Sequence, residues 1–378
     1  MAKVLLGMSG GLDSSVAAAL LREEGHEVIG MTIKTYNYSD VGGNSQAGST
    51  VPRDTSCCSL DGINDARRVA AKLGIPHYVA DMTEEFGSEI IDYFTDTYLS
   101  GKTPNPCVKC NREIKWAAML RKADALGCEF IATGHYARLR EVNGRTVISR
   151  AADAVKDQTY ALWAVRQEHL KRTKFPLAPY TKAESREIAR AHGLAVANKQ
   201  ESYEICFVTD NDYRRFLRDR VGTVRDGRGG SMDDRHAFQD GNFVLHGEPV
   251  GRHDGVPFYT IGQRKGLGLS LASHPEPLYV TGLDILRNEV IVGDDEDLFG
   301  NELTAHDVNL IKYDALPDEG MNVVAKIRYK DEGALARIVA LPDGRVHVLF
   351  EEPRRAITPG QSVAFYEGDD LVGGGIIS

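Results

Sequence analysis

The fold is decided by the stretch Lys3-Val4-Leu5-Leu6-Gly7-Met8-Ser9-Gly10-Gly11-Leu12-Asp13-Ser14-Ser15. An apolar run ends in a glycine and serine turn and a helical pattern begins at once, which predicts a strand, a tight loop and a helix N-terminus. Gly10 and Gly11 let the backbone approach a ligand closely. The first N–H groups of the helix favour an anion there. We therefore predict a phosphate-binding loop, with Asp13 as a candidate magnesium ligand.

No lysine follows these glycines, so the loop does not match the Walker pattern of P-loop nucleotide hydrolases. With Ser9 before the glycines and Asp13-Ser14-Ser15 after them, it resembles the SGGxDS loop of the PP-loop ATP pyrophosphatases. Those enzymes cut ATP between the α and β phosphates and leave AMP on a substrate oxygen. The alternative interpretation is an ordinary glycine-rich turn between a strand and a helix.

The bulk composition is that of a globular protein of two or three domains. The chain has 378 residues, 42% of them hydrophobic, which is enough for a sizeable core. No apolar run is long enough to span a membrane, and the N-terminus enters a strand pattern without a signal peptide, so we expect a cytoplasmic protein. The net charge of −9 does not indicate nucleic-acid binding, but a local basic face would suffice for it.

Strand and helix patterns alternate up to about residue 136, which predicts a doubly wound, mostly parallel α/β sheet covered on both faces. The expected strands after the first are 27–36, 77–80 and 129–136, and the expected helices are 14–24, 61–73 (capped by Asp61), 84–99 and 113–126. Residues 37–56 lack an apolar period and predict a long loop. The end of strand 27–36 should lie beside the nucleotide, with Ile33 as a candidate adenine contact or a core residue.

Further elements are predicted beyond residue 136, and the texture of the chain changes from Gly222 onward. Asn143-Gly144 predicts a hairpin over 138–150, and helices are expected over 157–173, 181–192 and 211–220. Short alternating segments from residue 282 onward, with turns at 341–344 and 358–360, predict a small antiparallel barrel. We expect three domains: a catalytic domain 1–212, a small mixed connecting domain 213–282 and a β-barrel 283–378.

A second informative stretch, GKTPNPCVKCNREIKW, covers residues 101–116. Its two prolines favour an extended, stiff loop, and Cys107 and Cys110 then fall at the start of a helix with Asn111 near its cap. The helix N-terminus and the cations Lys109, Arg112 and Lys115 lower a thiol's pKa, so these thiols are candidate nucleophiles or metal ligands. A zinc knuckle is disfavoured because no second Cys or His pair completes four ligands.

The other cysteines differ in their setting. Six cysteines without an export signal do not indicate a disulfide framework. Cys206, in the stretch Glu201-Ser202-Tyr203-Glu204-Ile205-Cys206-Phe207, would by itself be a core thiol, but beside a nucleotide loop and a C-x-x-C pair we interpret it as reactive. Cys128 precedes a buried strand and is interpreted as core. Cys57 and Cys58 are left unassigned.

Seven segments in this order resemble the tRNA-specific 2-thiouridylase family along nearly the whole chain: SGGLDSS, TPNPCVKCNREIKW, IATGHYAR, KDQTYAL, ESYEICFV, YTIGQRKGLG and ITPGQSVAFY. The resemblance implies an ATP-dependent enzyme that replaces O2 of the wobble uridine with sulfur in tRNAs with lysine-, glutamate- and glutamine-type anticodons. ATP, with Mg²⁺, would adenylate that oxygen, and AMP would leave when sulfur attacks C2. A cysteine desulfurase or a sulfur-relay protein would supply the sulfur.

The resemblance also implies residue roles. The ATP contacts would be Gly7, Met8, Ser9, Gly10, Gly11, Leu12, Asp13, Ser14, Ile33 and Gly134. Cys206 would carry a persulfide, and Cys110 would attack it, releasing the sulfur or leaving a Cys110–Cys206 disulfide that needs a reductant. Asn105, Pro106 and Cys107 would meet the flipped-out base. Further tRNA contacts would be His135, Lys156, Asp157, Gln158, Arg328, Tyr329 and Gln361.

Two features leave alternatives open. Many family members carry Asp where this chain has Cys107, and the thiols Cys107, Cys110 and Cys206 together suit a [4Fe-4S] cluster that delivers hydrosulfide, in place of the persulfide relay. The basic run Arg214, Arg215, Arg218 and Arg220 suits either phosphates or a solvated helix face.

Two rival functions remain beside tRNA thiolation. One is a PP-loop ligase or amidotransferase acting on a small acid, which would need no paired thiols. The other is a noncatalytic RNA-binding or sulfur-carrier module, which would have no use for the ATP loop. Release of pyrophosphate that depends on tRNA would separate all three.

Overall fold

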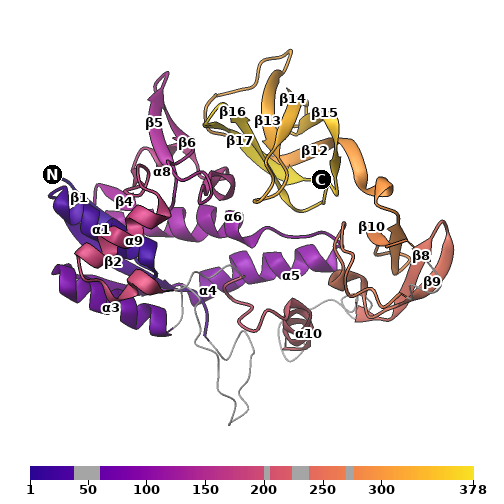
Figure 1. Cartoon of the computed structure of the whole chain (residues 1–378), viewed down its shortest axis with the longest axis horizontal. Coiled ribbons are helices and arrows are strands. Elements are labelled where there is room, and N and C mark those ends of the chain that lie inside the picture. Colours follow the sequence, from indigo (N-terminus) through magenta and orange to yellow (C-terminus); the bar gives the residue numbers. More distant parts are fainter. Residues whose placement is uncertain (38–59, 200–204, 224–237, 270–275) are drawn as a thin grey trace, which may run out of the picture.

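The computed structural model describes residues 1–37, 60–199, 205–223, 238–269 and 276–378 (Figure 1). The predicted loop 37–56, apart from its first residue, lies outside these ranges, as do Cys57, Cys58 and residues 201–204 of the Cys206 segment. None of the described helices is long and apolar enough to cross a membrane.

The amino-terminal part contains the predicted parallel sheet, with strand order β3-β2-β1-β4-β7. Its strands are β1 (Lys3–Gly7), β2 (Glu27–Lys34), β3 (His77–Asp81), β4 (Phe130–Ala132) and β7 (Thr173–Lys174). Val4 and Leu6 pack with buried residues of α1 (Leu12–Glu23), α3 (Leu60–Leu73) and α9 (Lys182–Ala191). Leu5, which points the other way, packs with residues of α7 (Met119–Ala125). Helices thus cover both faces, and the doubly wound fold is confirmed.

Two predicted helices contain wide π turns. The first runs through α4 (Thr83–Phe86), η1 (Gly87–Ile91) and α5 (Asp92–Leu99). The second runs through α6 (Pro106–Cys110), η2 (Asn111–Ala118) and α7, so it starts earlier than residue 113. Asp61 is not a cap but lies in the first turn of α3. The π turn directly after Cys110 is notable because such turns are frequent at functional sites.

The helix expected over 157–173 was wrong. The segment forms η3 (Thr159–Leu162), α8 (Gln167–Leu170) and strand β7, with Arg166 extended between them. A surface helix needs one buried face and one exposed polar face. Most side chains from Thr159 to Val165 are buried, so this segment has no such exposed face. The next helix, α9, agrees with its prediction and is capped by Thr181 in a capping box with Glu184; η4 (Ala195–Asn198) and α10 (Tyr213–Thr223) follow.

A second sheet has the strand order β10-β11-β8-β9. Its strands are β8 (Gly241–Leu245), β9 (Glu248–His253), β10 (Tyr279–Asp284) and β11 (Glu289–Gly293), with the short helices η7 (Val256–Phe258) and η8 (Glu296–Leu298) nearby. Phe243 and Phe258 share one hydrophobic cluster with Phe94 of α5 and Phe216 of α10. This small sheet therefore packs against α5 and α10 (Figure 1).

The predicted antiparallel barrel is confirmed. Its strands are β12 (Phe299–Leu310), β13 (Met321–Lys326), β14 (Ala334–Ala340), β15 (Val346–Arg355), β16 (Ser362–Glu367) and β17 (Asp370–Ile377). They follow the order β12-β15-β14-β13-β16-β17, and pairing of β12 with β17 closes the ring. Gly344 and Gly360 in the predicted turns have φ values of 81° and 87°. The domain limits themselves stay a prediction.

The predicted hairpin joins the first part to the barrel. Strands β5 (Arg138–Val142) and β6 (Arg145–Ser149) flank Asn143 and Gly144, whose φ values are 50° and 78°. Ser149 of β6 pairs with Asp370 of β17, so the hairpin extends the barrel sheet.

Asp370 is the charged centre of this junction. The residue is only 4% exposed and accepts hydrogen bonds from Ser149 Oγ at 2.6 Å, Lys312 Nζ at 2.8 Å and Arg140 Nη2 at 2.5 Å. Burial alone would raise the pKa of Asp370, but the bonds from Lys312, Ser149 and Arg140 outweigh it and lower the pKa. A buried carboxylate with these partners is costly to remove because its cations lose their counter-charge.

We predict that Asp370→Asn lowers the free energy of unfolding by roughly 3 kcal/mol at neutral pH. Because the folded-state pKa is lowered, the charge stabilises the protein above the unfolded-state pKa of about 4 and stops doing so as the pH falls through the folded value. Denaturant unfolding at several pH values should therefore show a difference that shrinks in acid. Asp369→Asn, at the exposed neighbour, is the control. Equal stability of the parent and Asp370→Asn at neutral pH would contradict the prediction.

Candidate active site

The loop between β1 and α1 is held against α3. Gly10 has a φ of 70°, and a Cβ atom there would lie only 2.0 Å from the carbonyl oxygen of Gly62. Lys199 Nζ donates to the carbonyl of Gly10 at 3.0 Å and pairs with Asp65 of α3 at 2.7 Å. The glycine is needed both for its backbone conformation and for this close packing.

The serines of the loop organise its backbone. Ser15 Oγ donates to the carbonyl of Gly11 at 2.7 Å, and Ser14 Oγ accepts from the N–H of Ser9 at 3.1 Å. Gly11 is the N-cap of α1, and in the described chain no side chain caps this helix. Its first N–H groups are therefore left to a ligand, as an anion-binding loop requires.

The other residues expected to contact the nucleotide lie at the same edge of the sheet. A Cβ atom at Gly134, which follows β4, would lie 2.7 Å from the nitrogen of Ser14 and 2.8 Å from the carbonyl carbon of Asp13. Gly7, the last residue of β1, pairs with Met31, so Ile33 extends beyond it at the carboxyl ends of the strands. The structure thus gathers residues 7–14, Ile33 and Gly134 at one edge, where ligands bind in open α/β sheets.

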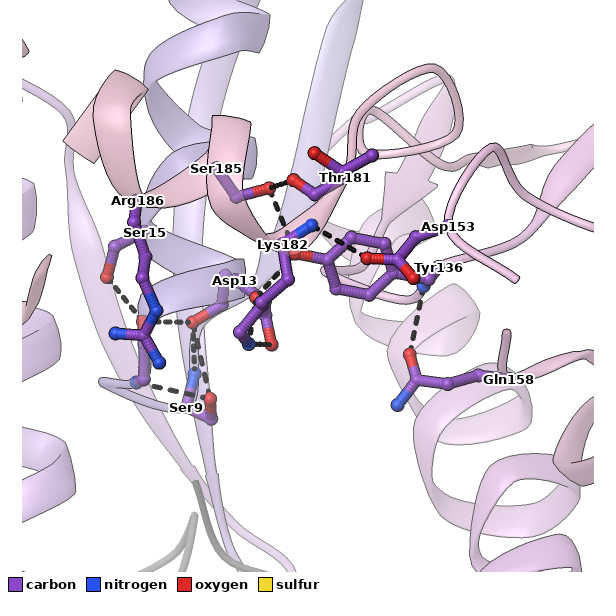
Figure 2. A network of polar contacts seen from close by, with 12 residues as sticks. Ser9, Asp13, Ser15, Tyr136, Asp153, Gln158, Thr181, Lys182, Ser185 and Arg186 are labelled. Carbon is purple, nitrogen blue, oxygen red and sulfur yellow. Dashed lines mark hydrogen bonds and ion pairs between the residues drawn. The ribbon is translucent and has the colours of Figure 1, made fainter. Parts of the chain in front are cut away.

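Asp13 is engaged by a lysine far along the chain (Figure 2). Lys182 Nζ lies 2.7 Å and 2.9 Å from the two carboxylate oxygens, and Tyr136 donates its hydroxyl hydrogen to the same carboxylate at 3.0 Å. Burial and the Asp13 charge raise the pKa of Tyr136, which keeps its phenol protonated. To bind magnesium, the Asp13 carboxylate would have to give up its contact with Lys182.

Sequence reasoning missed both lysines at the loop. Lys182 begins α9, 169 residues after Asp13, and Lys199 lies 189 residues after Gly10. No local pattern marks either residue as a loop contact, because the fold alone brings these segments together.

The C-x-x-C segment begins a helix, as predicted, but its cap differs. Asn105 is the N-cap, and its side chain accepts a hydrogen bond from the N–H of Val108 at 3.4 Å. Asn111 is instead buried within the helix and donates to the carbonyl of Ala161 at 2.8 Å. Cys107 is exposed and Cys110 is half-buried. Cys107 lies in the first turn of this helix and Cys110 is its fifth residue, so the helix dipole stabilises a thiolate most strongly at Cys107.

Carboxylates accompany the predicted cations of this segment. Lys109 pairs with Glu89 at 3.3 Å, and Arg112 pairs with Glu113 at 2.6 Å and with Asp307 of the barrel at 2.7 Å. These pairs reduce the positive field that Lys109 and Arg112 exert at the thiols.

Cys206 and Cys110 pack against the same hydrophobic cluster, to which Tyr36 and Phe207 belong. Cys206 is half-buried, and its carbonyl accepts a hydrogen bond from the Tyr36 hydroxyl at 2.9 Å. The ring of Phe207 lies among Phe86, Phe94 and Phe216 and anchors the chain next to Cys206. Both predicted thiols thus pack against this cluster, and neither is in a disulfide.

The remaining described cysteine is a core residue, as predicted. Cys128 is buried, and that burial raises the pKa of its thiol. Within residues 1–37, 60–199, 205–223, 238–269 and 276–378, no group of three His, Cys, Asp or Glu side chains is placed to hold a metal ion.

Some residues expected to contact RNA meet where the C-x-x-C loop touches the barrel. Gln361 donates to the carbonyls of Thr103 at 3.4 Å and Pro104 at 3.0 Å. Tyr329 is 45% exposed, and its ring lies 6.3 Å from that of Tyr160. Arg328 donates to the carbonyls of Arg355 and Ala356 at the barrel's edge.

The others lie in the segments that follow β4 and precede η3. His135 hydrogen-bonds Thr133 Oγ1 at 2.7 Å and packs between Trp116 and Phe175; its burial lowers the pKa of the imidazole well below the usual value, so the ring is neutral. Gln158 accepts from the N–H of Tyr136 at 2.9 Å. Asp157 accepts from the hydroxyl group of Thr159, and burial raises its pKa. Lys156 is partly buried beside it.

The basic run on α10 is occupied by contacts within the protein. Arg215 pairs with Asp210 and Asp219, each at 2.6 Å. Arg220 pairs with Asp92 at 2.7 Å. Arg214 and Arg218 lie over aromatic rings, at 5.2 Å from Tyr259 and 4.5 Å from Phe258. These contacts favour a structural role for the run, in fastening α10 to its neighbours.

Three family models match the chain in sequence order. They are described as the tRNA methyl transferase HUP domain over residues 2–210, the tRNA methyl transferase PRC-barrel domain over 232–294 and the aminomethyltransferase beta-barrel domain over 300–377.

Relatives match along nearly the full length. The chain is 49% identical over 378 residues to the tRNA-specific 2-thiouridylase MnmA of Amoebophilus asiaticus, covering 99% of this chain and 95% of the relative. It is 50% identical over 379 residues to the protein of the same name from Salinibacter ruber, covering 99% and 94%. A solved 4-thiouridine synthetase–RNA complex with bound ATP is 16% identical, covers 59% of this chain and 51% of that one, and has a TM-score of 0.37, too low to support a conclusion.

We predict that Gly134→Ala displaces the loop–helix junction, because its Cβ would overlap the backbone of Asp13 and Ser14. A loss of roughly 1–3 kcal/mol in unfolding free energy is expected from such overpacking, together with weaker ATP binding. Thermal unfolding and calorimetric titration with ATP would measure both. Gly87→Ala, where the added Cβ meets nothing within 4 Å, is the matched control. Wild-type stability and ATP affinity in Gly134→Ala would refute the contact.

Proposed function

This chain belongs to the tRNA-specific 2-thiouridylase family, and we propose that it makes 2-thiouridine in tRNA by adenylating O2 of the wobble uridine and replacing that oxygen with sulfur. One observation carries the assignment of residues. Strand β2 passes the nucleotide edge at Ile33 and leads to Tyr36, whose hydroxyl holds the Cys206 segment at 2.9 Å. The residues proposed for ATP and for sulfur are thereby adjacent in the fold.

The nucleotide would lie on residues 7–14, with its phosphates on the uncapped N-terminus of α1. The uridine O2 attacks the α-phosphorus of ATP, and pyrophosphate leaves. This step is needed because an oxygen bonded to C2 is a poor leaving group, whereas AMP is a good one. Magnesium would accompany the phosphates, with Asp13 as the carboxylate nearest to them.

The sulfur step would follow on the two thiols. A persulfide on Cys206 attacks C2 with its outer sulfur, and AMP leaves with the original oxygen. The Cys110 thiolate then attacks the Cys206 sulfur, which releases the thiolated uridine and forms a Cys110–Cys206 disulfide. An external thiol reductant returns both cysteines to the reduced state. Cys110 is suited to this attack because it lies near the N-terminal end of a helix.

The cluster alternative has less support. Cys107 is exposed while Cys110 and Cys206 are half-buried against the hydrophobic cluster, and no three metal-binding side chains of the described chain are placed to hold an ion. We therefore propose the relay and derive no step through a cluster.

The RNA would reach the thiols along the seam between the C-x-x-C loop and the barrel. Asn105, Pro106 and Cys107 would meet the flipped base. The proposed tRNA contacts beyond them are His135, Lys156, Asp157, Gln158, Arg328, Tyr329 and Gln361. The tRNAs would be those with lysine-, glutamate- and glutamine-type anticodons, the sulfur would come from a cysteine desulfurase or a relay protein, and the reaction would take place in the cytoplasm.

Methyl transfer is the second candidate, because two of the matched models are described as tRNA methyl transferase domains. The full-length relatives carry the thiouridylase name, and the paired cysteines Cys110 and Cys206 have a direct use in sulfur transfer. The mass of the modified nucleoside distinguishes the two outcomes.

We expect Cys110→Ser and Cys206→Ser each to abolish thiolation of substrate tRNA, because a hydroxyl group cannot attack or carry the persulfide. Mass spectrometry of digested tRNA after incubation with ATP and a sulfur donor would measure the product. Cys128→Ala, at the core thiol, should keep activity. Full thiolation by either serine variant would contradict the proposed roles, while tRNA-dependent pyrophosphate release should persist in both.

Cys107→Asp separates the relay from the cluster. The relay does not need a thiol at position 107, so this variant should retain thiolation. The iron content of anaerobically purified protein is the independent measurement. Protein that contains iron and loses activity with it, together with an inactive Cys107→Asp variant, would overturn the relay.

A further inference from the structure

The proposed phosphate loop carries no positive side chain of its own. Residues 7–15 include neither Lys nor Arg, and their one charged residue is Asp13. A carboxylate beside a triphosphate repels it strongly in a partly buried site. A loop that binds ATP with this composition therefore needs a cation, which either magnesium or a basic side chain from elsewhere in the chain can supply.

Lys182 is placed to supply that cation (Figure 2). Its ammonium contacts both oxygens of Asp13 at 2.7 Å and 2.9 Å, and its side chain is only 11% exposed. The ammonium also lies 5.6 Å from the ring centroid of Tyr136, which limits its surroundings on that side. Its charge therefore sits in the first turn of α1, where the proposed phosphates would lie.

The backbone of Lys182 is fixed at the start of α9, and a four-carbon stem separates it from the ammonium. The N–H of Lys182 donates to Asp153 at 2.8 Å, and the preceding residue, Thr181, caps α9. An ammonium has three donors on a flexible four-carbon stem, so it can contact a carboxylate and a phosphate oxygen together.

We propose that Lys182 is a phosphate-binding residue for ATP, replacing the lysine that Walker loops carry within the loop itself. When ATP is bound, the ammonium keeps one contact with Asp13 and donates to a phosphate oxygen. Asp13 then serves to hold Lys182 at the loop. This inference rests on the proposed function and names a residue of the same site.

The competing explanation is that Lys182 only neutralises Asp13 and tethers α9 to α1. The two explanations differ in what happens when both charges are removed. If Lys182 only neutralises, the double variant Asp13→Asn/Lys182→Met binds ATP as well as Asp13→Asn does. If Lys182 contacts phosphate, the double variant binds ATP more weakly than Asp13→Asn does.

The experiment is calorimetric titration of the full chain with ATP in the absence of magnesium, so that no metal contact to Asp13 intervenes. Lys182→Met should weaken ATP binding roughly ten- to a hundredfold, the range for a hydrogen bond to a charged group. Asp13→Asn should bind ATP more tightly, since it removes a negative charge. The double variant should bind ATP more tightly than Lys182→Met for the same reason, but about ten- to a hundredfold more weakly than Asp13→Asn. The affinity for adenosine, which has no phosphate, should not change in Lys182→Met.

Lys72→Met is the matched control. Lys72 Nζ also tethers two segments, since it donates to the carbonyl of Gly193 at 2.6 Å, but it lies in the last turn of α3, far along that helix from Gly62. Its removal lowers the net charge equally and should leave ATP affinity unchanged.

Unchanged ATP affinity in Lys182→Met, or recovery to the Asp13→Asn level in the double variant, would overturn the inference. Should Lys182→Met not fold because Asp13 loses its partner, the double variant compared with Asp13→Asn decides alone. Wild-type protein that binds no ATP under conditions with and without magnesium would instead refute the proposed function.

Discussion

The hydrogen bonds between the loop before the thiols and a turn of the barrel are the constraint on which the site depends. Thr103 donates its N–H to the carbonyl of Pro359 at 2.9 Å, and Gln361 returns bonds to the carbonyls of Thr103 and Pro104. Gly360 lies so close that a Cβ there would meet the oxygen of Thr103 at 2.7 Å. These contacts fix where the helix carrying Cys107 and Cys110 begins.

The site otherwise draws on segments that are distant in sequence. One edge of the parallel sheet offers the N-terminus of α1, while β2 continues from that edge to Tyr36 and the Cys206 carbonyl. The cations nearest the loop, Lys182 and Lys199, arrive from α9 and the segment after η4. Because many arginines of this acidic chain are paired internally, RNA would be positioned by polar groups at the seam more than by a broad basic surface.

The sequence predicted correctly those elements whose structure depends on residues close together in the chain. The loop at residues 7–15, the Asn143-Gly144 hairpin and the closed barrel follow from period, glycine placement and turn type, and all are confirmed. The helix over 157–173 failed because tertiary burial of Thr159 to Val165 overrode local helix propensity. The cap at Asn105, the Lys182–Asp13 pair and the Tyr36 bond to Cys206 depend on three-dimensional neighbours, which a single sequence does not reveal.

The contacts between the barrel and residues 103–104 also have a consequence for the order in which the chain folds during synthesis. The turn that binds Thr103 is itself fastened by β17, through bonds between Gly360 and Ile377 and between Ile377 and Gln361, each 2.8 Å long. A ribosome makes residues 103–110 long before it makes residues 360–377. A growing chain in which residues 7–15 are already folded therefore still lacks the barrel turn that supports residues 103–110. The loop before Cys107 and Cys110 gains these contacts only after β17 has been made.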